Sequence, residues 1–149
     1  KFISMFLSQY NQLKRLKFNL KKRTRLFKSH TNFLSKFSDF FETPLQKNNV
    51  KTGWLAYPIT VKTNKYFDRT NLQIFLEKNN IQTRVVFTGN ILRQPAFKSI
   101  KCIKKRSYKY ADKIMKNSLL IACHHGLTIK EIKHIYSTIN KFFKYKKIY

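Results

Sequence analysis

The 149-residue sequence is poor in cysteine and glycine, and both shortages exclude classes of protein. Its two cysteines, Cys102 and Cys123, are too few for a disulfide scaffold and fit a reduced, cytoplasmic setting. The three glycines, Gly53, Gly89 and Gly126, lie too far apart to form a phosphate-binding glycine loop. We therefore expect neither a small secreted domain nor a P-loop or dinucleotide-binding motif.

Acidic residues are also scarce, with six in all against 32 lysines and arginines. Each acid can be assigned to a helix cap, a helix end or a helix surface; the six are Asp39, Glu42, Asp68, Glu77, Asp112 and Glu131. The sequence has neither a His-x-x-x-His nor a Cys-x-x-Cys pair for a metal ion. The cysteines have no oriented third partner for nucleophilic catalysis, so a buried structural position is the better interpretation. The sequence thus predicts no catalytic residue and no metal site in this chain.

The surplus of basic residues gives a formal net charge of +26. Ten of them lie in residues 1–36, where there is no acid. Such a surface attracts polyanions, so binding of nucleic acid through its phosphates is one hypothesis. The chain is also crowded with Asn, Ile, Phe and Tyr, and its basic residues are spread over its whole length. This joint bias favours a compositional drift at tolerant surface positions.

Long hydrophobic runs are missing as well. The longest apolar stretches, 2–7 and 118–123, are far shorter than the roughly 20 residues of a membrane helix. Hydrophobic residues nevertheless make up 42% of the chain and aromatic residues 15%, which is enough for a core. We expect one folded domain, or part of one, with no membrane partner.

Residues 2–41 contain neither glycine nor proline, and apolar side chains recur there in steps of three and four. This spacing predicts a long amphipathic helix, in one piece or in two. Such a helix would span about 60 Å, whereas a compact chain of this length has a diameter of roughly 38 Å. The helix therefore either reaches outside its own domain or bends into a hairpin near residues 21–25. Because the first residue is Lys1 and not Met, we expect the C-terminal part of a longer protein.

The middle of the chain predicts short strands and helices. We expect strands at 53–61, 81–87 and 119–123, a loop at 88–95, a helix at 110–116, and a helix that begins after Asp68 and buries Leu72, Phe75 and Leu76. Pro58 places the first strand at an edge or a bulge. Asn79 and Asn80 end the first of these helices, because asparagine tolerates the left-handed conformation.

The last helix has the clearest signature. Thr128 and Glu131 form a capping box, in which each side chain satisfies a free backbone amide. Apolar residues follow at helical spacing; they are Ile132, Ile135, Ile139 and Phe142 or Phe143. The basic tail 144–149 is expected to fray. The order of elements predicts an α+β fold, with a long N-terminal helix followed by a small β-sheet packed with helices.

One loop carries an unusual number of hydrogen-bonding groups. Arg84, Asn90, Arg93 and Gln94 surround Gly89, which would let the backbone approach a ligand closely. Arginine suits phosphate and amides suit hydroxyls, so this loop favours an anionic, hydroxyl-rich ligand. A second candidate is the pair His124-His125 before Gly126, for which pocket-lining or capping roles are the default.

These segments together resemble the C-terminal part of the DegT/DnrJ/StrS family, the pyridoxal-phosphate-dependent sugar aminotransferases and the related nucleotide-hexulose 3-dehydratases. The pieces that resemble the family occur in family order and are 53–59 (GWLAYPI), 67–77 with 81–84 (IQTR), 87–95 (FTGNILRQP), 111–115 (ADKIM) and 120–128 (LIACHHGLT). Val86-Phe87 stands where most of the aminotransferases carry a His-Tyr pair. That departure favours the 3-dehydratase branch.

The resemblance implies a role for each part of the chain. Residues 1–43 would be the connecting helix from a cofactor domain upstream, 44–143 the small substrate domain, and 144–149 a basic tail. The small domain's share of the substrate pocket would be Arg84, Phe87, Gly89, Asn90, Arg93, Gln94, Pro95, His124 and His125. Pyridoxal phosphate and its catalytic residue would belong to the missing domain, so this chain alone would be inactive.

The implied whole enzyme is a cytoplasmic homodimer that acts on a nucleotide-linked keto-deoxy sugar for lipopolysaccharide or O-antigen synthesis. Two other hypotheses stay open on the residues alone. The chain would then be a stand-alone basic module that binds nucleic acid, or an inactive remnant of a gene.

Overall fold

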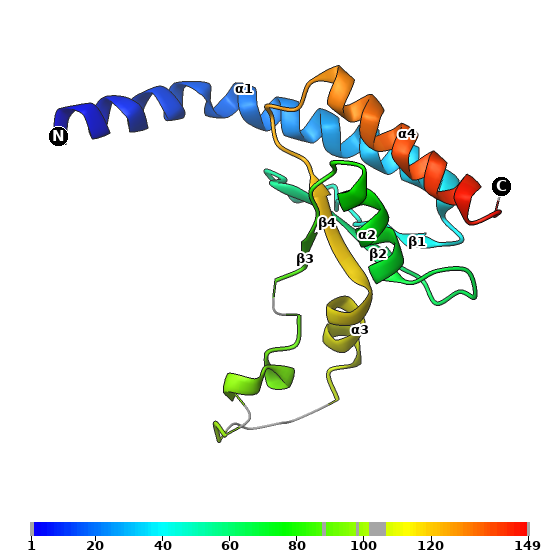
Figure 1. The fold of residues 1–149 in the computed structure, drawn as a ribbon. Coiled ribbons are helices and arrows are strands. Elements are labelled where there is room, and N and C mark those ends of the chain that lie inside the picture. The colour runs from blue at the N-terminus through cyan, green and yellow to red at the C-terminus, as the bar shows by residue number, and fades with distance from the viewer. Residues whose placement is uncertain (1, 88, 98, 102–106, 149) are drawn as a thin grey trace.

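The computed structural model describes residues 2–87, 89–97, 99–101 and 107–148, and for residues 2–9 the backbone only; Cys102 lies outside this part of the chain. The elements are α1 (Phe2–Leu34), β1 (Phe41–Glu42), β2 (Ala56–Val61), α2 (Arg69–Lys78), β3 (Arg84–Val85), α3 (Lys109–Asn117), β4 (Ser118–Ala122) and α4 (Ile129–Tyr145), with short 3₁₀ turns at Ser35–Phe37, Ile91–Arg93 and Pro95–Phe97. Figure 1 shows the long helix, the small sheet and the shorter helices around it. The predicted α+β fold is confirmed.

The sheet is antiparallel and has the strand order β1-β2-β4-β3. Its centre is the pairing of β2 with β4, in which Pro58 lies opposite Leu120. We predicted that Pro58 lies in an edge strand or at a bulge. Strand β2 is not an edge strand of the sheet, because it lies between β1 and β4. However, β1 pairs only with Thr60 and Val61, so at Pro58 the strand has a partner on one side only. A proline without an N–H is tolerated at such a place.

Helix α1 is continuous from Phe2 to Leu34, so the alternative of a hairpin near residues 21–25 is wrong. The helix also ends seven residues before the predicted position 41, and the connecting segment 1–43 is therefore helix only in part. The apolar spacing of Phe37, Phe40 and Phe41 fits a helix, but the backbone of Phe40 and Phe41 forms hydrogen bonds and strand pairs instead. The carbonyl of Phe40 accepts from the amide of Lys62, and Phe41 pairs with Val61. Strand pairing with β2 overrides the helical pattern here.

The N-terminal half of α1 extends beyond the rest of the molecule, as Figure 1 shows. Several large apolar side chains on it are exposed, among them Leu13 (67%) and Phe18 (60%). Further along the same helix, Leu26, Phe27 and Leu34 are buried in the core. This confirms the expectation that the helix reaches outside its own domain.

The core lies between the sheet and the helices α1, α2 and α4. It contains Tyr57 and Ile59 from β2, Leu72 and Leu76 from α2, and the predicted stripe of Ile135, Ile139, Phe142 and Phe143 from α4. His30 of α1 is fully buried among them and satisfied on both ring nitrogens. Its Nδ1 lies 3.0 Å from the hydroxyl of Tyr136, and its Nε2 lies 3.0 Å from the carbonyl oxygen of Ala122. His30 thus joins α1 to α4 and β4.

The ends of the later elements follow the sequence in part. Asp68 and Thr128 both cap their helices with full capping boxes, and Asn80 has a φ of 60°, as predicted. The predicted strand 81–87 shrinks to Arg84–Val85. One cause is Thr83, whose N–H and hydroxyl both donate to Glu77 Oε1 at 2.7 Å and not to a strand.

The predicted fraying of the C-terminal tail is wrong for residues 144–148. Helix α4 continues to Tyr145. The amide of Ile148 then donates to the carbonyl of Phe143, at 3.1 Å. The side chain of Ile148 packs against the core, which holds this end in place.

Candidate substrate-binding surfaces

The nine predicted site residues divide into two groups in the structure. Six of them, Phe87, Gly89, Asn90, Arg93, Gln94 and Pro95, lie on the segment between β3 and α3 that Figure 1 shows extending away from the sheet. We call its described part, residues 86–87, 89–97 and 99–101, the arm. Arg84 and His124 lie instead on a cavity beside α4, and His125 faces a neighbouring pocket.

The arm is held to α3 by the carboxylate of Asp112. Arg93 donates from Nε to Oδ1 at 3.1 Å and from Nη2 to Oδ2 at 3.0 Å. Asn90 donates its Nδ2 to Oδ1 at 2.7 Å, while its own Oδ1 caps the turn by accepting from the amide of Leu92. The hydrogen bonds from Arg93 and then Asn90 lower the pKa of Asp112 below its usual value. Asn90 is buried, whereas the side chain of Arg93 stays 64% exposed.

Gly89 brings the arm backbone directly against α3. Its φ is +63°, and a Cβ at this position would clash with the Cβ of Met115. The sequence predicted that the backbone at Gly89 approaches a ligand, and this stays a prediction; the neighbour that the structure describes there is helix α3. Phe87 on the same arm has a φ of 44° and is 87% exposed. The arm therefore presents Phe87 and Arg93 outward from a fixed backbone.

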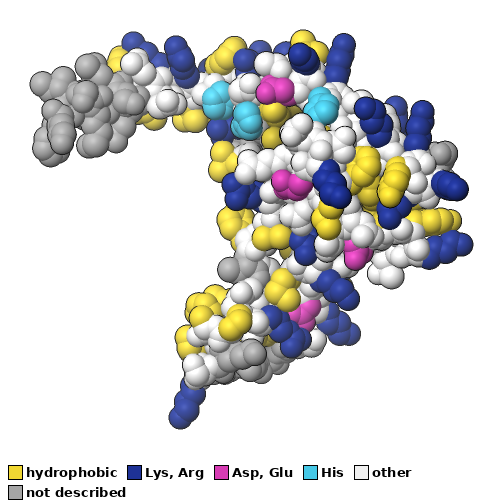
Figure 2. All heavy atoms as spheres, viewed as in Figure 1, with side chains coloured by type: hydrophobic (Ala, Val, Ile, Leu, Met, Phe, Trp, Pro, Cys, Tyr) yellow, Lys and Arg dark blue, Asp and Glu magenta, His cyan; other side chains and the backbone are white. Residues whose placement is uncertain are grey.

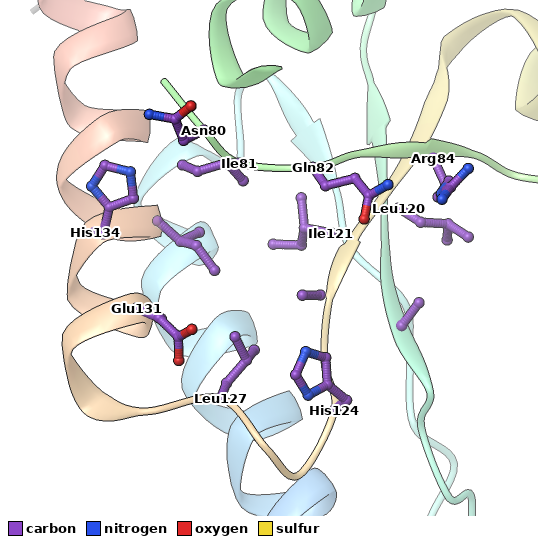
Figure 3. A pocket seen from close by; sticks show the side chains of 13 residues that line it. Asn80, Ile81, Gln82, Arg84, Leu120, Ile121, His124, Leu127, Glu131 and His134 are labelled. Atoms are coloured by element: carbon purple, nitrogen blue, oxygen red, sulfur yellow. The ribbon is translucent and has the colours of Figure 1, made fainter. Parts of the chain in front are cut away.

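The second group borders the space between β4 and the first turns of α4, which we call the β4–α4 cavity. It has a volume of about 330 Å³, and Figure 3 shows its lining side chains. His124 Nδ1 accepts from the amide of Gly126 at 3.2 Å, so the ring proton of the neutral form is on Nε2. Glu131 Oε2 accepts from both the amide and the hydroxyl of Thr128, each at 2.7 Å. These bonds from Thr128 lower the pKa of Glu131.

Two further residues complete the rim of the β4–α4 cavity. His134 Nε2 donates to the carbonyl of Asn79 at 2.8 Å, which leaves its Nδ1 as an acceptor. Arg84 lies on β3 opposite Leu120. The cavity therefore combines residues from β3, β4 and α4 that are far apart in the sequence.

His125 and Cys123 have local structural partners. Arg23 Nη2 donates to His125 Nδ1 at 3.3 Å, which connects α1 to the turn after β4. Cys123 is fully buried, and burial raises the pKa of its thiol to about 11. A thiol with that pKa stays protonated near neutral pH and is a poor nucleophile. In the part of the chain that the structure describes, no group of three or more His, Cys, Asp or Glu residues could hold a metal ion.

On the face that Figure 2 shows, the described basic residues do not gather in one place. Figure 2 shows Lys and Arg side chains spread over the visible face, on the helices and beside the sheet alike. Among the lysines whose exposure is described, none is buried. Within the same described residues, no helix has the length and apolar character of a membrane span.

Three functional candidates were missed by reasoning from the sequence: Asp112, Glu131 as a cavity residue, and His134. Asp112 offered a signal, since it is one of six acids in a chain with 32 basic residues. It also lies within residues 111–115, one of the pieces that resemble the family. His134 offered none, because its partner Asn79 is 55 residues away.

Comparison with known proteins identifies the class. Residues 8–140 match the model of the DegT/DnrJ/EryC1/StrS aminotransferase family, and the chain belongs to this family. Among solved structures, an aminotransferase from Psychrobacter cryohalolentis superposes with a TM-score of 0.81 at 18% identity, over 93% of this chain and 38% of that one. A GDP-4-keto-6-deoxymannose-3-dehydratase gives a TM-score of 0.70 at 23% identity, over 87% of this chain and 33% of that one.

The names of two curated relatives describe a narrower function than the family description does. The lipopolysaccharide biosynthesis protein RfbH of Salmonella typhimurium is 30% identical over 132 residues, which is 89% of this chain and 30% of the relative. A dTDP-4-dehydro-2,6-dideoxy-D-glucose 3-dehydratase of Saccharopolyspora spinosa is 28% identical over 99 residues, which is 66% of this chain and 21% of the relative. The chain thus spans less than a third of the length of either relative.

Proposed function

We propose that this chain is the small, sugar-facing part of a pyridoxal-phosphate-dependent enzyme that dehydrates a nucleotide-linked keto-deoxy sugar. The whole enzyme would be a cytoplasmic homodimer that makes sugars for lipopolysaccharide. The observation that carries the proposal is the arm, whose sequence from Phe87 to Pro95 resembles the corresponding loop of the 3-dehydratase branch. Two relatives support this proposal: one is named as a 3-dehydratase, and the other is named for lipopolysaccharide biosynthesis.

The arm is built to present two groups to a ligand. Asp112 fixes the guanidinium of Arg93 through Nε and Nη2, while the side chain stays largely exposed. A guanidinium held in this way loses little further freedom when it binds a phosphate or a sugar hydroxyl. Phe87 offers an exposed ring that can cover the apolar face of a sugar and exclude water.

The cofactor itself would be held elsewhere. Pyridoxal phosphate, when bound, supplies the electron sink for the bond-breaking step. A lysine that binds it covalently needs a desolvated position that lowers its pKa. The described lysines do not fit, since none of those with described exposure is buried. Incubation with pyridoxal phosphate followed by borohydride reduction should therefore leave no single lysine of this chain stoichiometrically modified, as peptide mass spectrometry can check.

A chimera tests the proposed function. The 132-residue segment of Salmonella RfbH that matches this chain is exchanged for this chain, and the gene is returned to a strain that lacks RfbH. We expect lipopolysaccharide synthesis to recover at least in part, and an Arg93→Met version of the chimera to fail. Lys65→Met, on an exposed loop outside the arm, serves as the matched control. A soluble chimera that restores nothing would favour an inactive remnant.

A further inference from the structure

We propose that the β4–α4 cavity binds an uncharged, hydroxylated six-membered ring of pyranose size, at a site separate from the arm. The site would be additional to the proposed function and does not depend on it; it would use Arg84 and His124, which the family resemblance assigned to the substrate pocket. Four properties of the cavity support this assignment: its charge balance, its fixed donors and acceptors, its apolar floor and its size.

The cavity is balanced in charge within a strongly basic chain. Its lining contains one formally positive side chain, Arg84, and one formally negative side chain, Glu131, and no lysine. The chain as a whole carries +26. A site for phosphate or another anion would show an excess of cationic groups, which this lining does not have. The ligand that complements it is neutral overall.

The polar groups around the cavity are held in fixed directions. His124 presents Nε2–H as a donor because its Nδ1 is occupied by the amide of Gly126. Glu131 keeps Oε1 as an acceptor because both bonds from Thr128 end on Oε2. Figure 3 shows the side chains of His124 and Glu131 directed towards the centre, while Gln82 extends along the opposite rim towards Arg84. Neighbouring hydroxyl groups, each both donor and acceptor, match such an alternating set.

The floor of the cavity is aliphatic. Seven of its thirteen lining residues are Ala56, Ile81, Leu120, Ile121, Ala122, Leu127 and Ile135. An apolar floor with polar groups at the rim fits a ring that has a C–H face and hydroxyl groups around its edge. The volume of about 330 Å³ is at the lower end of small-molecule sites, which span about 300–1,000 Å³. It suits one ring and not a dinucleotide.

The test is a titration of the ¹⁵N-labelled 149-residue chain with methyl α-L-rhamnopyranoside, followed by NMR. We expect saturable shifts at the amides of Gln82, Leu127 and Glu131, and none on the arm. Removing one hydrogen-bonding group should weaken the affinity about fivefold, so His124→Phe and Gln82→Leu should each do so. Lys133→Leu is the control, because this exposed residue of α4 does not line the cavity.

Three results would overturn the assignment. The first is the absence of saturable shifts at the cavity amides. The second is an equal affinity in the His124→Phe and Lys133→Leu chains. The third is tighter binding of glucose 6-phosphate at the same amides, which would indicate an anion site. Gln82 is exposed, so Gln82→Leu decides the matter if His124→Phe does not fold.

Discussion

The guanidinium of Arg93 and the carboxylate of Asp112 form a two-bond ion pair, Nε to Oδ1 at 3.1 Å and Nη2 to Oδ2 at 3.0 Å. Both residues are accessible to solvent, so the pair adds little to global stability. Its geometry fixes the direction of Arg93, however, and Asn90 donates to the same carboxylate. The pair therefore orders the arm.

Replacing Asp112 by asparagine should loosen the arm without unfolding the domain. The neutral amide cannot accept both bonds from Arg93 with the strength of a carboxylate. We expect faster trypsin cleavage after Arg93 and an almost unchanged urea midpoint. Glu42→Gln is the control, because it removes the other ion pair to α3, from Lys113 to Glu42, at 2.6 Å. Equal cleavage rates in the two variants would show that Asp112 does not order the arm.

Gly89→Ala should separate the arm from α3. The substitution forces a residue with a Cβ into a φ of +63°, which costs roughly 1–2 kcal/mol, and places that Cβ against the backbone of Met115. We expect increased hydrogen exchange at the arm amides, measured by mass spectrometry. Gly126→Ala is the comparison, since its Cβ would approach only the ring of His124, at 3.2 Å. An unchanged exchange pattern in Gly89→Ala would mean that the arm does not depend on this contact.

His30 should make stability fall in mild acid. Burial lowers its pKa in the folded chain below the ordinary histidine value of 6.5, although its bond to the Ala122 carbonyl opposes this. The unfolded chain therefore takes up a proton first as the pH drops. This contribution is complete above pH 6.5 and is lost as the pH falls through the lower folded pKa.

Urea unfolding at pH 7.5 and 5.5 measures this effect. The wild-type chain and an exposed control, His134→Asn, should both lose stability between the two values. His30→Gln should start about 1–3 kcal/mol lower because Tyr136 loses its partner, and it should lack the His30 part of the decline. An identical decline in His30→Gln would assign the pH dependence to other groups.

Thr128→Ala should weaken the start of α4. The hydroxyl accepts from the amide of Glu131 and donates to its carboxylate, so the change removes a cap worth about 1 kcal/mol. Thermal unfolding measures the loss, with the exposed Thr63→Ala as control. The same change leaves the carboxylate of Glu131 with the amide bond alone, so its direction is less fixed and rhamnoside binding in the β4–α4 cavity should also weaken. A melting temperature equal to that of the control would contradict the role of the cap.

Local patterns predicted a large share of this fold. The N-cap at Asp68, the capping box at Thr128, the left-handed Asn80 and the apolar stripe of α4 depend on residues a few positions apart, where spacing decides the structure. The end of α1 was different. The aromatic spacing after Leu34 fits a helix, and only the distant strand β2 shows why the chain pairs there as β1.

The candidate site was predicted less completely for the same reason. The motif around Gly89 and Arg93 indicated a ligand, but the structure shows that part of its polar capacity is used by Asp112, 19 residues from Arg93. The β4–α4 cavity needs residues from Ala56 to Ile135, and no short pattern connects them. Periodicity finds faces of single elements and not the places where different elements meet.

The proposed function is tested most directly by comparing two ligands on the ¹⁵N-labelled chain, dTDP-glucose and a short DNA duplex. We expect dTDP-glucose to shift the arm amides around Asn90 and Arg93 and to saturate. The duplex should give only weak, dispersed shifts that disappear with added salt. Arm amides that ignore dTDP-glucose, together with saturable binding of the duplex along α1, would contradict the sugar-enzyme assignment and favour a nucleic-acid module.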